Sequence, residues 1–95
     1  GCGYLMDREC IQVQIKYFAN FREITGKPEE SIQFPIEARL TDVIDWLNKR
    51  YQLALPNTKT IGILNGKGWM QFPEQLATPL REGDAIGLMP IIHGG

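Results

Sequence analysis

The chain ends on two glycines, Gly94 and Gly95, and the second of them carries the terminal carboxylate. Glycine has no Cβ, so a Gly-Gly end can enter a narrow slot and adopt strained backbone angles. A terminal carboxyl group has a pKa of about 3.3–3.7, so it is ionised at neutral pH and is a poor acyl donor. Acyl chemistry at Gly95 therefore needs activation from outside, for example by adenylation. This pattern favours a carboxylate that is threaded into another enzyme's active site.

Few other residues are arranged for catalysis. His93 is the only histidine, and no Ser or Cys stands beside it to complete a nucleophilic pair. We interpret it as a tail residue that touches a partner's cleft. The stretch "NGKG" at 65–68 lacks the spacing of a P-loop and a following helix, so it predicts a turn. Cys2 and Cys10 are expected to be reduced thiols of a cytoplasmic protein, and no metal site is expected because the one histidine is distant from both.

Length and charge narrow the class of protein. The chain has 95 residues and a net charge of −1, which suits one domain. Lys and Arg are spread along the sequence, so a nucleic-acid partner is not expected. No apolar run approaches the roughly 20 residues of a membrane helix, and no membrane association is expected.

The first half of the chain predicts a hairpin and then a helix. Apolar and polar residues alternate over 10–18 and over 31–36, which is typical of strands buried on one face. Because Pro35 cannot donate a ladder hydrogen bond, the second strand is expected to lie at an edge of the sheet or to end there. Residues 19–26 between the two strands predict a helical turn that ends at Gly26. Residues 40–52 carry an apolar stripe of helical period, with Thr41 as the expected N-cap.

The second half predicts short strands. Residues 61–64 and 69–72 flank an Asn65-Gly66 turn, and residues 85–92 form a last strand that stops at Pro90. If the first strand pairs beside the last, the last strand lies in the sheet interior and the tail leaves a rigid element. The order predicts an α+β fold in which one main helix packs on one face of a mixed sheet.

Three segments follow from this pattern. Residues 1–9 are expected to be an N-terminal extension, and one interpretation takes Met6 as the native start, with residues 1–5 left from cloning. Residues 10–90 form the domain, and residues 91–95 form a flexible tail that ends in Gly-Gly. One helix covers only one face of a sheet, so apolar residues on the other face, among them Phe18 and Met89, would form a docking patch.

At this point the motifs resemble a known family. The segments "VQIKYFANFREITG", "LNG", "REGDAIGLMP" and the terminal "GG" are similar to the small subunit of molybdopterin synthase, the MoaD family of β-grasp, ubiquitin-like sulfur carriers. The resemblance spans residues 10–95. The thiamine sulfur carriers share the fold and the glycine tail but usually lack the "FA..RE..G" segment.

The resemblance implies a mechanism in which this chain is a non-catalytic sulfur donor. An adenylating enzyme (MoeB-like) uses ATP and Mg²⁺ to form an acyl-adenylate at Gly95, and sulfur from a sulfurtransferase then displaces AMP. The resulting thiocarboxylate enters the large synthase subunit (MoaE-like) and gives sulfur to cyclic pyranopterin monophosphate, in molybdenum cofactor biosynthesis. No cofactor is bound by this chain itself.

The family also implies site residues. Gly94 and Gly95 carry over directly, and the expected partner interface comprises Phe18, Met70, Met89, Pro90, Ile92 and His93. The tail departs from the usual "PPVSGG", and the segment between Asn65 and "GD" is longer than usual, which puts the partner's identity in doubt more than the fold. The alternatives are a ubiquitin-like protein modifier, a sulfur carrier for thiamine synthesis or tRNA thiolation, and a plain interaction module whose glycine end is incidental.

Overall fold

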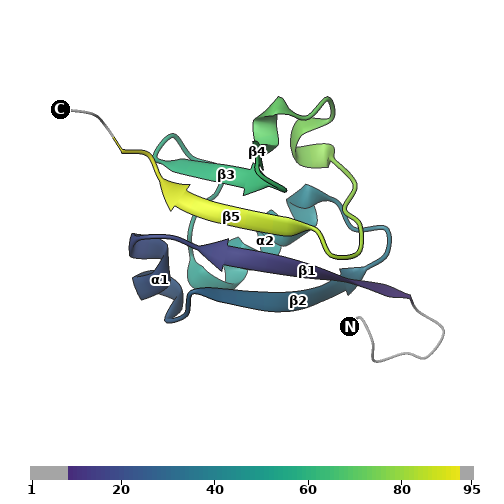
Figure 1. Ribbon diagram of the computed structural model, residues 1–95, viewed down its shortest axis with the longest axis horizontal. Helices are drawn as coiled ribbons and strands as arrows, with labels where there is room; N and C mark the ends of the chain where they lie inside the picture. The colour runs from purple at the N-terminus through teal and green to yellow at the C-terminus, as the bar shows by residue number, and fades with distance from the viewer. Residues whose placement is uncertain (1–8, 93–95) are drawn as a thin grey trace.

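The computed structural model describes residues 9–92 of the chain. Its elements, in chain order, are β1 (Cys10–Tyr17), α1 (Asn20–Thr25), β2 (Glu29–Pro35), α2 (Leu40–Tyr51), β3 (Thr60–Leu64), β4 (Lys67–Gly68), the 3₁₀ turns η1 (Trp69–Gln71) and η2 (Gln75–Ala77), and β5 (Ala85–Pro90). Figure 1 shows the sheet face-on, with α2 behind it.

The five strands form one mixed sheet in the order β2-β1-β5-β3-β4. β1 and β2 form the predicted antiparallel hairpin, and β2 with Pro35 lies at the edge, as expected. β5 pairs parallel to β1 and antiparallel to β3. The last strand therefore lies in the sheet interior, held by hydrogen bonds on both sides, and carries the chain toward the tail (Figure 1).

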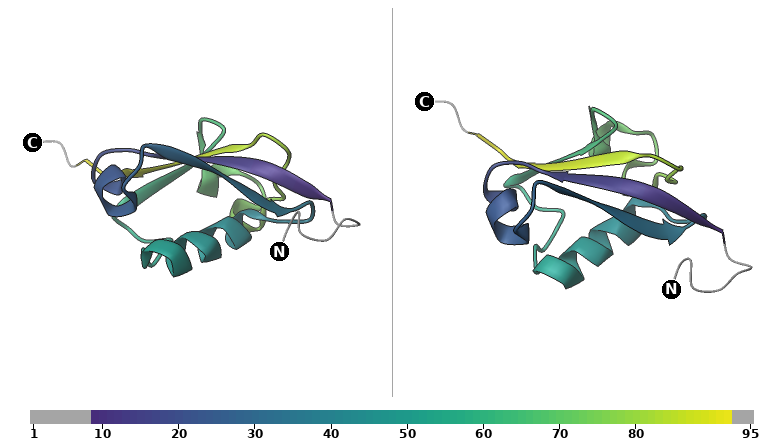
Figure 2. Two further views of the ribbon diagram at one scale, coloured as in Figure 1. Left: turned by 90° about the horizontal axis from the view of Figure 1, so that it is seen from below. Right: turned by 60° about the horizontal axis from the view of Figure 1, so that its bottom comes forward.

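A single main helix, α2, covers one face of the sheet (Figure 2). Its apolar stripe has the period of a helix, so the residues that share one face are all buried: Leu40, Val43, Ile44 and Leu47. Burying each such side chain contributes roughly 1.5–3 kcal/mol. This is the predicted α+β, β-grasp architecture, and it leaves the opposite face of the sheet without a covering helix.

The start of α2 differs from the prediction. Thr41 is not the N-cap, because the helix begins at Leu40 and the cap is Arg39. The Arg39 N–H donates to Oδ2 of Asp42 at 2.7 Å. The carboxylate of Asp42 in the first turn thus accepts from the backbone N–H of the cap residue, and Leu40, the first residue of the helix, is buried in the core.

The predicted strand over 69–72 is also wrong, because none of these residues is in a strand. Only Lys67 and Gly68 pair with β3, and the chain then turns through η1. Trp69 is buried, and a Cβ at Gly62 would overlap its indole ring. The chain leaves the sheet here so that the indole can cover the bare backbone of β3.

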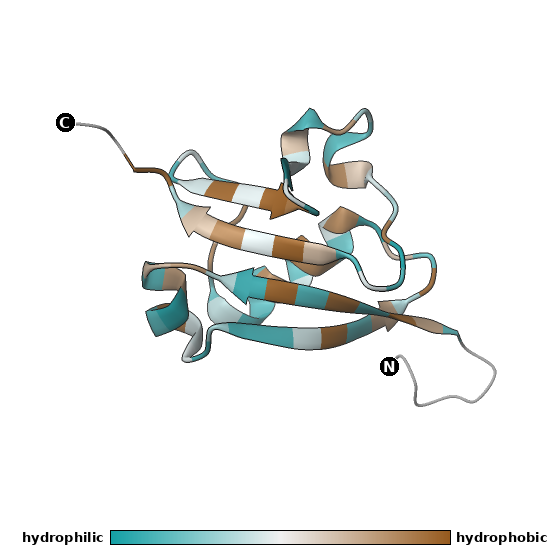
Figure 3. Ribbon diagram, viewed as in Figure 1, coloured by the Kyte–Doolittle hydropathy of each residue, from teal (hydrophilic) through white to brown (hydrophobic). Residues whose placement is uncertain are grey.

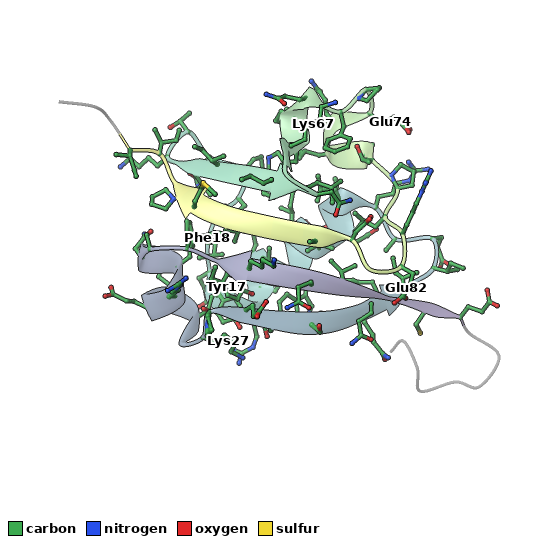
Figure 4. The ribbon with its side chains drawn as sticks, viewed as in Figure 1. Tyr17, Phe18, Lys27, Lys67, Glu74 and Glu82 are labelled. Atoms are coloured by element: carbon green, nitrogen blue, oxygen red, sulfur yellow. The ribbon has the colours of Figure 1, made fainter. Side chains whose placement is uncertain are left out.

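The motifs "LNG" and "REGD" fix the beginning of β5. Asn65 has positive φ, as the predicted turn requires. Its side chain donates to Oδ1 of Asp84 at 3.0 Å and accepts the Ala85 N–H at 2.9 Å. Glu82, beside β1 in Figure 4, accepts the Gln12 N–H at 2.9 Å. These hydrogen bonds fix the beginning of β5 in the sheet, and this sets the direction in which the C-terminal end of the strand points.

The cysteines give a further correction. Cys10, at the start of β1, is disulfide-bonded, so the expected reduced thiol is wrong at this position. The expectation followed from the cellular compartment and from how little a bridge between two cysteines so close in sequence would stabilise the chain. Within residues 9–92, no helix has the length and apolar character needed to span a membrane.

Candidate functional site

The end of β5 is the point where the chain leaves the fold. Pro90 pairs with Thr60 in the β3–β5 ladder, and the Ile91 N–H donates to the Lys59 carbonyl at 3.0 Å. Ile92 follows directly and is 86% exposed. Because the last anchored residue is Ile91, the described fold offers a firm root for whatever follows. The predicted residues His93, Gly94 and Gly95 lie outside the described residues.

An apolar patch lies on the uncovered face next to this root. Strand alternation places Ile61 and Ile63 of β3 on the face opposite the core, and pairing sets them beside Met89 and Gly87 of β5. In Figure 3, β3 and β5 are mostly brown with near-white bands, whereas brown and teal bands alternate along β1. We call the set Phe18, Ile61, Ile63, Gly87 and Met89 the open-face patch.

Phe18 completes the patch from the end of β1. A Cβ at Gly87 would lie 3.4 Å from the Phe18 ring and 3.8 Å from Ile63, so the ring lies over the bare backbone of β5. Phe18 is 37% exposed. Together with Met89 and Ile63 it lines a shallow depression of about 210 Å³. Figure 4 shows Phe18 close to the end of β5.

The segment after β1 holds Phe18 in this position. The Phe18 N–H donates to the Leu88 carbonyl at 3.0 Å, which ties the residue to β5. Ala19 then turns the chain with a φ of 53°, and α1 follows. The Arg22 guanidinium donates from Nε to the Tyr17 carbonyl at 3.1 Å. The family motif "YFANFREITG" is thus the scaffold of this corner of the molecule.

The patch occupies only one half of the uncovered face. The other half, over β1 and β2, carries polar side chains that bond to one another. Gln14 donates to Glu29 at 2.7 Å, and Ser31 donates to Gln14 at 2.7 Å. The apolar surface is therefore concentrated on the half that leads to the tail.

The structure unites some of the predicted interface residues and separates another. Phe18 and Met89 line the same depression, and Pro90 and Ile92 continue from it along the tail root. Met70 is 49% exposed but lies on η1 and is not among the described residues that line this depression. Ile61 and Ile63 were missed, although the alternation in "TIGIL" places both on one face.

A polar cluster below the sheet is structural. Glu30 accepts hydrogen bonds from the Tyr17 hydroxyl at 2.5 Å, the Tyr51 hydroxyl at 2.6 Å and the Lys27 ammonium at 3.3 Å. Burial opposes the charge of Glu30, but these donors outweigh it and lower its pKa. Burial and then Glu30 itself raise the pKa of Tyr17 and of Tyr51. At neutral pH this carboxylate is ionised, and its hydrogen bonds join β1, β2 and α2.

The described residues hold no other chemistry-bearing cluster. Among residues 9–92, no group of three or more His, Cys, Asp or Glu side chains is arranged for a metal ion. What the described arrangement offers is a docking surface beside a rigid tail root. The reacting group expected from the sequence belongs to the residues that follow.

Known proteins are similar to this chain in sequence and in fold. The molybdopterin synthase sulfur carrier subunit of Drosophila ananassae is 28% identical over 91 residues, covering 94% of this chain and 97% of that protein. The solution structure of small archaeal modifier protein 1 from Methanosarcina acetivorans is similar with a TM-score of 0.71 and 25% identity, covering 92% of this chain and 99% of that chain.

A second similar structure is a chain in the protein–protein complex of subunits 1 and 2 of molybdopterin-converting factor from Helicobacter pylori 26695. Its TM-score is 0.57 and its identity 26%, over 90% of this chain and 100% of that chain. These similarities confirm the family resemblance that the sequence motifs indicated. The sequence profile of the ThiS family matches residues 15–95, which is most of the chain, and the chain therefore belongs to the ThiS family.

Proposed function

We propose that this chain is the sulfur carrier subunit of a molybdopterin synthase, and that Gly95 is its reacting residue. The observation that carries the proposal is the placement of the tail root. The last anchored residue, Ile91, lies beside the open-face patch, and Ile92 after it is exposed. A carrier needs this combination, because its fold must be gripped while its terminus reaches into another protein.

The chemistry begins at the terminal carboxylate. An oxygen of the ionised Gly95 carboxylate attacks the α-phosphorus of ATP in an adenylating enzyme that holds Mg²⁺, and pyrophosphate leaves. The outer sulfur of a persulfide on a sulfurtransferase then attacks the acyl carbon, and AMP leaves. A second thiol of that enzyme cleaves the S–S bond of the resulting acyl disulfide, which leaves a disulfide on the enzyme and frees the terminal sulfur. The product is a thiocarboxylate on Gly95, which donates sulfur to cyclic pyranopterin monophosphate in the large subunit.

The fold contributes grip and access. Interfaces of this kind have a desolvated apolar centre and a polar rim. The open-face patch supplies such a centre, and the polar half of the same face supplies a rim. The structural similarity to a chain in a complex of two molybdopterin-converting subunits supports the large subunit as the partner.

The test is intact-mass spectrometry of the protein co-expressed with an adenylating enzyme and a sulfurtransferase. We expect a mass gain that corresponds to exchange of one oxygen for sulfur, located on Gly95 by peptide mapping. A variant that lacks Gly95 serves as the control and should show no exchange. An unmodified Gly95 after productive adenylation would contradict the proposal.

A second candidate function is supported by one of the similar structures. The Methanosarcina acetivorans protein is named a small archaeal modifier, so an activated Gly95 could instead form an isopeptide bond with a lysine of a target. The same co-expression separates the two. Ladders of lysine conjugates that disappear when Gly95 is removed would support the modifier over the carrier.

A further inference from the structure

A second apolar depression lies at the same end of the molecule as the open-face patch. It has a volume of about 650 Å³ and lies among α1, the α2–β3 loop and the end of β5. Figure 2 shows α1 and α2 on the same side of the sheet. We call it the tail-root groove and define it by Phe21, Ile24, Leu53, Lys59, Pro90 and Ile91, which all line it.

Several apolar side chains that line the groove remain partly exposed to solvent. Phe21 is buried and anchors α1 to the core. Ile24, one turn later, lines the groove and remains 48% exposed, so its packing within the chain is incomplete. Leu53, Pro90 and Ile91 are each half-buried around it. Contiguous exposed apolar surface of this kind marks an interaction site more often than isolated residues do.

The groove is continuous with the tail root. Ile91 lines the groove, and Ile92 follows it directly. Met89, two residues earlier, lines the depression of the open-face patch. The last residues of β5 therefore pass between two apolar depressions. A protein that holds Gly95 in its cleft must come within a few residues of both.

We propose that the tail-root groove receives an apolar side chain of the large subunit of molybdopterin synthase, presented beside the cleft that takes the tail. This proposal rests on the proposed function. Lys59 is exposed at the rim and is the one charged residue among the described lining residues. The partner segment that enters the groove should therefore carry a carboxylate next to its apolar anchor. The large subunit would then contact the end of β5 on both faces of the sheet, at the open-face patch and at the tail-root groove.

The test compares two isoleucines of nearly equal exposure. Ile24→Gln alters the groove, whereas Ile36→Gln alters a residue that is 50% exposed and follows β2, outside the groove. Affinity for the purified large subunit from the same organism is measured by calorimetry with the full-length chain. We expect Ile24→Gln to weaken binding at least tenfold and Ile36→Gln to leave it unchanged. Thermal unfolding confirms that both variants fold.

A charge variant keeps the test independent of the folding of α1. Lys59→Glu should weaken binding several-fold, and less so at high salt, because screening reduces the repulsion. Lys49→Glu, on the exposed side of α2, is its control. Equal affinities for the paired variants would overturn the groove proposal and leave the proposed function intact, as would a loss confined to the adenylating enzyme. No binding of the unaltered chain to the large subunit would overturn both.

Discussion

The ring of Phe18 lies over Gly87, and a Cβ at residue 87 would approach it to 3.4 Å. The indole of Trp69 lies over Gly62 on the other face of the sheet, and there a Cβ would overlap the ring. Both glycines leave room for an aromatic ring. They differ in what the ring can do, because Phe18 is partly exposed and Trp69 is buried.

This difference predicts opposite outcomes for two alanine substitutions. Gly62→Ala should lower the free energy of unfolding by about 1–3 kcal/mol, because a buried indole cannot move aside without disturbing the core. Gly87→Ala should change it by less than about 1 kcal/mol, since a partly exposed ring can shift and Ala suits a strand better than Gly. Chemical denaturation measures both values. A Gly87→Ala variant less stable than Gly62→Ala would contradict this account.

Phe18 itself should matter more for binding than for stability. Phe18→Ala removes the aromatic ring of the open-face patch. It should weaken the complex with the large subunit at least tenfold, which corresponds to about 1.4 kcal/mol. Gln33→Ala alters an exposed residue on the polar half of the same face and should bind normally. Calorimetric titration of both variants distinguishes a localised interface from one spread over the whole face.

Glu30 should stabilise the fold in a pH-dependent way. Its pKa is lowered in the folded chain from an ordinary value of 4.5, so the folded state binds its proton less readily than the unfolded state does. The stabilisation is therefore present above the unfolded pKa and is lost as the pH falls through the folded pKa. Glu30→Gln should lower the free energy of unfolding by about 1–3 kcal/mol at neutral pH and by much less at pH 3.

The control for that measurement is the neighbouring carboxylate. Glu29 is exposed and accepts a side-chain hydrogen bond from Gln14, so Glu29→Gln should lower the free energy of unfolding only slightly at any pH. Denaturation curves recorded from pH 3 to pH 7 would show the two variants converging at the acid end. A constant deficit for Glu30→Gln across that range would mean that shape, not charge, explains the loss.

The tail predicts a separation of activity from stability. One alanine added after Gly95 should abolish thiocarboxylate formation, because the acyl group would then sit one residue beyond the position that the adenylating enzyme receives. The melting temperature should not change, since the Ile92 side chain is already exposed to solvent. Mass spectrometry and thermal unfolding of the same sample measure both. A melting temperature that falls by several degrees would show that the terminus contributes to the core.

Local patterns in the sequence were enough to predict the framework. Alternation in β1 and β2 identified the hairpin, and the apolar stripe from Leu40 identified α2. The interior position of β5 followed from the hypothesis that the first strand pairs beside the last. Phe18 and Met89 could be nominated for the interface because one lies off the core side of its strand and the other is next to the tail.

What could not be predicted depends on contacts between distant residues. Trp69 leaves the expected strand because Gly62, in another element, offers a surface for its ring. Tyr51 bonds to Glu30 across 21 positions of sequence, and no local pattern encodes that pairing. The tail-root groove likewise joins α1, the α2–β3 loop and β5. Each of these features becomes visible only once the elements are packed together in space.

The hydrogen bond from Ile91 to Lys59 also sets a length scale for any reaction at the terminus. Four residues follow Ile91, and a fully extended chain spans at most about 3.6 Å per residue. The acyl carbon can thus travel no more than about 14 Å from the sheet. For the proposed reaction at Gly95, a catalyst must therefore keep its reacting atoms within about that depth of its own surface.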